Sequence, residues 1–166
     1  VADGLNINIT LLFSQDAYVA VAEAYIRGLE KRAARGEDVS QSASVASFFV
    51  SRIDTLVEKM IASREKTATP QQRALFDEVQ GKVAIANARQ AYQKYKKLFS
   101  GPRWQALASK GAKTQRVLWA STGTKNPKYS DVLYIEELIG RDTVNTIPPA
   151  TLDAFRNGTI TFLAAS

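Results

Sequence analysis

Residues 6–14 read NINITLLFS, and this stretch decides the fold because it joins a buried strand to the start of a helix. Polar and apolar residues alternate at first and the run then becomes wholly apolar, which is typical of strands in buried parallel sheets. Ser14 is a good N-cap, and Asp16 favours a first helical turn. The stretch also poses a question, because Asn8 and Thr10 put polar groups on one face of an apolar strand, which costs free energy unless they find partners.

The alternation of strand and helix continues along the chain. Tyr18, Val21, Tyr25 and Leu29 lie on one face at helical spacing, and Gly36 ends that helix. Pro148 and Pro149 open the last helix. We predict strands at residues 6–13, 44–50, 115–122 and 143–147, and helices at 16–36, 55–64, 71–99, 104–109, 131–140 and 150–158.

This β-α-β-α-β-α-β-α order predicts an α/β fold built from parallel βα units. Four such units make half of a (β/α)8 barrel or a small open sheet, because a complete barrel typically needs about 250 residues. We therefore expect the 166 residues to form one segment, residues 1–166, without a second domain. The chain does not begin with Met and begins almost at a strand, which suggests a piece of a longer protein, a processed product or an expression scar.

Composition excludes several kinds of chemistry. The chain has no Cys and no His, so zinc sites, Ser-His-Asp triads and Cys-His pairs are excluded. No apolar run of about 18 residues is present, and no membrane span is expected. The net charge of +6 indicates either a solvated basic surface or an anionic ligand such as a sugar phosphate or nucleic acid. Because the Lys and Arg residues are spread over helix ends without a nucleic-acid motif, we expect no nucleic-acid binding.

Small polar groups recur where the predicted strands end, which is the edge that carries function in parallel α/β folds. Hydroxyl and amide groups suit the oxygens of a polyol, and a cation follows each of two strands. Arg52 and Lys125 are these cations, and they suit a phosphate. From pattern alone, it is equally open that Arg52 pairs with a helix acid and that Lys125 is solvated. The residues at these ends are Asn8, Thr10, Ser47, Phe49, Arg52, Ser121, Thr122, Thr124, Lys125, Asn126, Asn145 and Thr146.

Five motifs resemble the transaldolase family, in order and over nearly the whole chain. They read NINITLLFSQDAYVAVAEAYIRGLE, ASVASFFVSRID, GKVAIANARQAY, VLWASTGTKNPKYSDVLYIEELIG and DTVNTIPPATLDAF. The resemblance implies a (β/α)8 barrel enzyme of the pentose phosphate pathway, located in the cytoplasm. Such an enzyme moves a dihydroxyacetone unit between sugar phosphates of the fructose 6-phosphate and sedoheptulose 7-phosphate class. It uses a lysine Schiff base and needs no metal or other cofactor.

The resemblance also implies roles for individual residues. Thr10 resembles the threonine that helps hold the catalytic water, and Asn8 resembles the active-site asparagine beside it. Both would then face the barrel interior, which answers the question raised by the first strand. The expected substrate-binding residues are Ser47 and Phe49 in the sugar pocket, Arg52 and Ser121 on the phosphate, and Lys125 as a second cation where better-known relatives have arginine.

Two departures from the family pattern matter. Phe48 and Ser51 stand where the better-known relatives have Pro and Gly. In the family, the Schiff-base lysine lies on the strand before NITLLFS, and the acid–base carboxylates lie earlier still. The chain then corresponds to strands five to eight and lacks that lysine. Neither Lys82, which should begin a helix, nor Lys125 replaces it.

Three functions therefore remain open. The first is a partial transaldolase that is inactive alone. The second is a non-catalytic module that binds sugar phosphates or other anions, and the third and most remote is a basic nucleic-acid binder. A half-barrel also leaves two unpaired sheet edges, so we expect pairing with the missing half or with a second copy.

Overall fold

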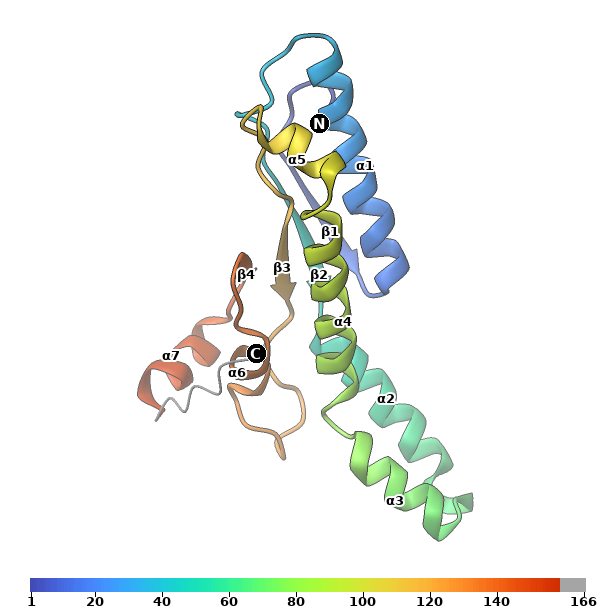
Figure 1. The fold of residues 1–166 in the computed structure, drawn as a ribbon. Helices are drawn as coiled ribbons and strands as arrows, with labels where there is room; N and C mark the ends of the chain where they lie inside the picture. The colour runs from blue at the N-terminus through green and yellow to red at the C-terminus, as the bar shows by residue number, and fades with distance from the viewer. Residues whose placement is uncertain (159–166) are drawn as a thin grey trace. The chain divides into compact units, whose positions relative to one another are not determined.

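A computed structural model describes residues 1–158 and contains one four-stranded parallel sheet with strand order β1-β2-β3-β4. Figure 1 follows the chain through its strands and helices. β1 and β2 pair in parallel with Asn8 opposite Val45, and the register shifts between Ile9 and Leu12. The strands are β1 (Ile7–Leu12), β2 (Ser44–Phe49), β3 (Arg116–Ala120) and β4 (Thr143–Asn145). The predicted α/β class and all four predicted strands are confirmed.

Helices connect each strand to the next, as parallel neighbours require. The side chain of Ser14 caps the first helix by accepting a hydrogen bond from the Ala17 N–H, as predicted. Gly36 follows that helix with φ 72°, a left-handed conformation that favours glycine. The helices are α1 (Gln15–Ala34), α2 (Ser51–Arg64), the 3-10 turn η1 (Glu65–Thr67), α3 (Pro70–Val79), α4 (Val83–Leu98), α5 (Pro102–Ala108), α6 (Leu133–Leu138) and α7 (Pro149–Asn157).

Two of the predicted helices show the largest differences from the structure. The helix predicted at 55–64 begins at Ser51, where the Ser51 N–H donates to the Ser121 carbonyl. The sequence did not indicate this start, because no side-chain cap marks it. The helix predicted at 71–99 is two helices. The break lies at Gly81, which has φ 70°, a conformation that favours glycine. A Cβ at this position would lie 3.2 Å from the Cζ atom of the Tyr129 ring.

The chain divides into two compact units. Unit 1 comprises Val1–Phe48, Gln90–Leu118 and Asp142–Val144. Unit 2 comprises Phe49–Arg89, Trp119–Arg141 and, of the described residues, 145–158.

Unit 1 has an aromatic core between α1 and one face of the sheet. Tyr18, Tyr25 and Leu29 are buried as predicted, whereas Val21 is only partly buried. The Tyr18 ring meets the Phe48 ring edge-on, with centroids 6.4 Å apart. An edge-to-face pair of this kind adds to the free energy of burial. The predicted helical face thus covers β2.

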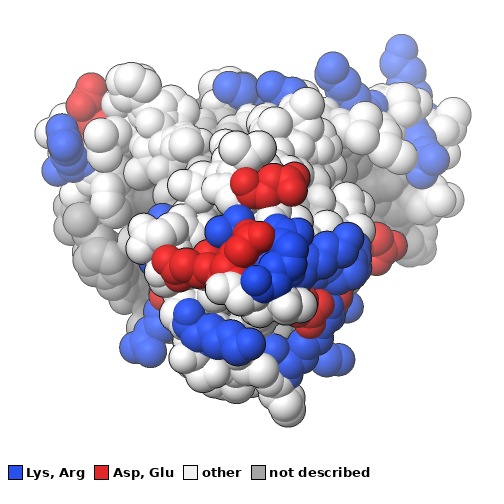
Figure 2. Space-filling view, turned by 90° about the horizontal axis from the view of Figure 1, so that it is seen from above, with Lys and Arg blue, Asp and Glu red and all other residues white. Residues whose placement is uncertain are grey.

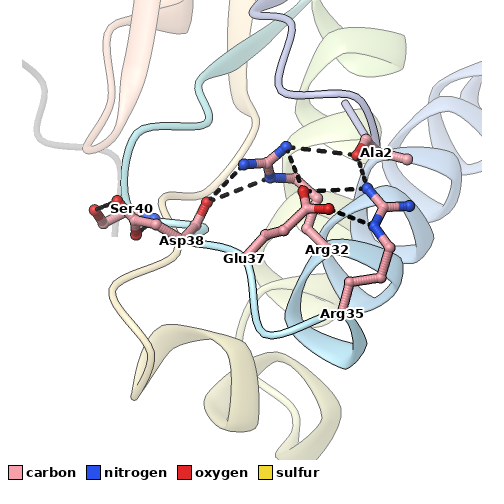
Figure 3. Close-up of polar contacts among 6 residues, drawn as sticks. All are labelled: Ala2, Arg32, Arg35, Glu37, Asp38 and Ser40. Atoms are coloured by element: carbon pink, nitrogen blue, oxygen red, sulfur yellow. Dashed lines mark hydrogen bonds and ion pairs between the residues drawn. The ribbon is translucent and has the colours of Figure 1, made fainter.

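Charged side chains at the end of α1 hold the segment that leads into β1 (Figure 3). Arg32 and Arg35 both donate to the Ala2 carbonyl, and Glu37 pairs with the two guanidinium groups. Arg32 also donates to the Asp38 carbonyl at 3.0 Å. These two arginines are therefore engaged in local contacts, which account for the basic residues at this helix end.

The surface charges are mixed on the face shown in Figure 2, where Lys and Arg side chains lie next to Asp and Glu side chains. Arg103 bridges Glu23 and Glu30, with each contact 2.6 Å long. Among residues 1–158, no helix combines the length and the apolar character that crossing a membrane would require.

Candidate functional site

The candidate anion site in unit 2 is built where β2 and β3 end. Ser51 begins α2 with only Val50 between it and the end of β2, and Ser121 directly follows β3. Their hydroxyl oxygens are 2.9 Å apart, and the Ser51 N–H donates to the Ser121 carbonyl at 3.0 Å. Ser121 has φ 57°, a conformation that non-glycine residues rarely adopt and that often occurs at functional sites. The two strand ends are thus joined through backbone and side chain.

Arg52 is the second residue of α2, so it lies beside the Ser51–Ser121 contact in the chain. Its guanidinium carbon is 4.9 Å from the centroid of the Phe49 ring. A ring face at this distance attracts a cation and restricts its position. The side chain remains exposed, which leaves its donors available to an anion.

The loop that follows β3 carries Lys125 and is held on both sides of it. Before Lys125, the buried hydroxyl of Thr122 donates to the Asn145 side chain at 2.8 Å. After Lys125, the Asn126 amide donates to the Glu58 carboxylate at 3.2 Å. Lys125 itself is exposed. The loop is therefore fixed while its cation is accessible.

A buried carboxylate in α2 supports this arrangement. Asp54, only 2% exposed, accepts the Ala84 N–H at 2.9 Å and the Tyr134 hydroxyl at 2.7 Å. Burial raises the pKa of Asp54 above its usual range and outweighs these two hydrogen bonds, which lower it. Burial and the hydrogen bond to Asp54 also raise the pKa of Tyr134. Asp54 thus satisfies the first turn of α4 and joins α2 to α6.

The residues expected in the sugar pocket that belong to unit 1 come from β1 and β2. Ser47 is buried, and its hydroxyl donates to the Asn8 side-chain oxygen at 2.7 Å. Asn8 and Thr10 are exposed, whereas Ile7 and Ile9, which alternate with them, are partly buried. Asn8 therefore has a polar partner on its own face, as the cost of an unpaired group requires. Leu11, next to Thr10, has φ 62° at the register shift.

A groove of about 490 Å³ lies in unit 1, at the end where the strands begin. Asn8, Lys113 and Arg116 contribute to its lining. Asn8 is the only predicted site residue in that lining, and function in parallel α/β folds is found at the opposite strand ends. We therefore do not assign the site to this groove.

The predicted residues thus form two groups, each inside one unit. Asn8, Thr10 and Ser47 belong to unit 1. The second group, in unit 2, is Phe49, Arg52, Ser121 and Lys125. Within it, the structure brings Arg52 onto Phe49 and fixes Ser121 next to the start of α2.

Sequence reasoning missed the residues that support the site. Asp54 and Glu58 are one helical turn apart on a partly apolar helix face. A carboxylate on such a face was the sequence feature that could have indicated their supporting role. Thr122 and Asn145, which the pattern offered as ligands, are hydrogen-bonded to each other.

Comparison with known proteins agrees with the motifs. The family model for transaldolase/fructose-6-phosphate aldolase matches residues 1–164. A transaldolase of Trichodesmium erythraeum is 57% identical over 155 residues, which is 93% of this chain and 41% of that protein. A transaldolase 2 of a Nostoc species is 58% identical over 156 residues, and a transaldolase of Frankia alni is 53% identical over 154.

The chain spans about 41% of the length of the first two relatives. Together with the four-stranded parallel sheet, this agrees with half of a (β/α)8 barrel. Such high identity over nearly the whole chain extends well beyond the site motifs. The chain belongs to the transaldolase/fructose-6-phosphate aldolase family.

Proposed function

We propose that this chain is one segment of a transaldolase, the C-terminal half of its barrel, and supplies the phosphate site and part of the sugar pocket. The complete enzyme moves a dihydroxyacetone unit between sugar phosphates of the fructose 6-phosphate and sedoheptulose 7-phosphate class, in the cytoplasm. The observation that carries the proposal is the placement of Arg52 and Ser121 at neighbouring strand ends, linked through Ser51. Family membership supports the reaction class.

The proposed roles follow from the chemistry of the side chains. Arg52 and Lys125 neutralise the phosphate, and the Ser121 hydroxyl donates a hydrogen bond to it. Ser47 and Phe49 line the sugar pocket. Asn8 orients the substrate, and Thr10 holds the water that takes part in proton transfer.

The nucleophile of the reaction lies outside these 166 residues in this proposal. A Schiff-base lysine needs surroundings that favour its free amine, such as a desolvated apolar pocket. Every lysine of the chain falls within the described residues, and every one is exposed. None of them, Lys82 and Lys125 included, has such surroundings.

The second candidate is a module that binds sugar phosphates or other anions without catalysis. The same Arg52, Ser121 and Lys125 arrangement supports it, since anion binding requires no nucleophile. Binding of a sugar phosphate by the longest natural form of the protein, without turnover, would favour this candidate. Salt-dependent binding to random DNA would instead favour a nucleic-acid binder.

Substituting the proposed phosphate arginine tests the site directly. We expect Arg52→Ala to weaken binding of fructose 6-phosphate by about 1.5–3 kcal/mol, the typical worth of a hydrogen bond to a charged group. Isothermal titration calorimetry of the two proteins measures the difference. Arg64→Ala is the matched control, because Arg64 is an exposed arginine at the far end of the same helix.

Equal affinity of Arg52→Ala and the original chain would contradict the assignment of Arg52. Equal weakening by Arg64→Ala would show that only the net charge matters. Failure of the original chain to bind any sugar phosphate or inorganic phosphate would contradict the anion site as a whole.

The unpaired edges of the sheet indicate where this chain associates with a partner. β1 and β4 are the outer strands, and within residues 1–158 no further strand pairs with either. Unpaired edges invite pairing, so we propose that they join the missing half of the barrel or a second copy. We expect self-association that rises with concentration in analytical ultracentrifugation. A single monomeric species at high concentration would contradict this prediction.

A further inference from the structure

Ser51 contacts the proposed phosphate serine in two ways. Its N–H donates to the Ser121 carbonyl at 3.0 Å, a bond that any residue except proline can make. Its hydroxyl lies 2.9 Å from the Ser121 hydroxyl, and this contact needs a hydroxyl at position 51. Ser51 is only 1% exposed, whereas Ser121 is partly exposed. A bound anion can therefore reach Ser121 but not Ser51.

The direction of the hydroxyl contact depends on what Ser121 does. Each serine hydroxyl has one proton to donate and can accept two hydrogen bonds. Either hydroxyl can be the donor in the observed contact. Once Ser121 donates its proton to an anion, only Ser51 can donate in this contact. The two hydroxyls then form a chain in which each bond strengthens the next.

The contact also restricts the orientation of Ser121. A serine side chain has three staggered rotamers, and an exposed hydroxyl exchanges among them. The Ser51 hydroxyl favours the rotamer that brings the Ser121 oxygen to 2.9 Å. Because Arg52 directly follows Ser51, the same residue also fixes the start of the helix that carries the proposed phosphate arginine.

We propose that Ser51 is a positioning residue of the anion site, which donates its proton to the Ser121 hydroxyl and so directs the Ser121 proton toward a bound phosphate group. The proposal rests on the proposed function of Arg52 and Ser121. It adds a residue that does not touch the ligand and whose hydroxyl acts through Ser121 alone.

The test is a double-substitution cycle on the whole 166-residue chain, with inorganic phosphate and fructose 6-phosphate as probes. We expect Ser51→Ala to weaken phosphate binding by about three- to tenfold, the range for one hydrogen bond. In a chain that already carries Ser121→Ala, the same substitution should have almost no further effect. Ser51→Gly, which like Ser51→Ala removes the hydroxyl and keeps the N–H, should weaken phosphate binding to a similar extent. Ser63→Ala is the matched control, because the exposed Ser63 hydroxyl donates to the Met60 carbonyl of the same helix.

The outcomes separate this proposal from the one on which it rests. If the original chain binds phosphate and Ser51→Ala does not change the affinity, only the proposed role of Ser51 is overturned. Equal weakening by Ser51→Ala with and without the Ser121 hydroxyl also overturns it, because a merely structural role would act independently of Ser121. Absence of phosphate binding by the original chain overturns the proposed anion site and this role with it. Weakening that disappears in the Ser121→Ala background supports the proposal.

Discussion

We expect the 166-residue chain, assayed alone, to form no reducible adduct with fructose 6-phosphate and to show no transaldolase turnover. The reaction needs an amine in surroundings that favour its neutral form and a carboxylate nearby to move protons. All lysines of this chain are exposed, so none has those surroundings. The measurement is borohydride trapping followed by peptide mass mapping, with turnover measured beside a buffer blank.

The matched control supplies the preceding barrel segment of a relative in trans or as a fusion. We expect activity to return only in that case, with the adduct on a lysine of the added segment. A reduced adduct on any lysine of the 166 residues, together with turnover, would show that the catalytic lysine has been placed wrongly.

The second large effect concerns the buried carboxylate Asp54. We expect Asp54→Ala to lower the free energy of unfolding by about 2–5 kcal/mol, because it leaves two buried donors without an acceptor. These donors are the Ala84 N–H and the Tyr134 hydroxyl. Urea unfolding measured by circular dichroism checks the loss. Asp77→Ala is the control, since Asp77 is exposed on α3 and should change stability little.

Asp54→Asn separates the hydrogen bonds from the charge. Asparagine keeps an acceptor oxygen but does not ionise. Burial raises the pKa of Asp54 in the folded state above its unfolded-state value of about 3.9. The part of the stability that comes from this pKa difference is fully present below the unfolded-state value and is lost as the pH rises through the raised value. We therefore expect Asp54→Asn to gain stability relative to the original chain as the pH rises above about 4. A difference that does not change with pH would contradict the shift, and a loss as large as that of Asp54→Ala would show that the acceptor oxygen is not what matters.

The sequence by itself determined the order of the elements and the class of the fold. Local signals were strong there. The apolar run of β1 ends at the capping hydroxyl of Ser14, and Gly36 supplies the left-handed residue after α1. Pro149 marks the first turn of α7. Each of these signals acts within a few residues, so periodicity and capping rules can detect it. The motifs also identified the family, which the comparisons confirm.

The tertiary structure alone decided where two helices begin and how the candidate site is supported. α4 starts at Val83 because Gly81 turns the chain and a carboxylate from α2, Asp54, accepts the Ala84 N–H. α2 starts at Ser51 because its N–H and hydroxyl meet Ser121, which is 70 positions away. The partners in these contacts are far apart in the sequence, so no local pattern could place them. They meet because neighbouring strands of the sheet end side by side, and that adjacency exists only once the sheet has formed.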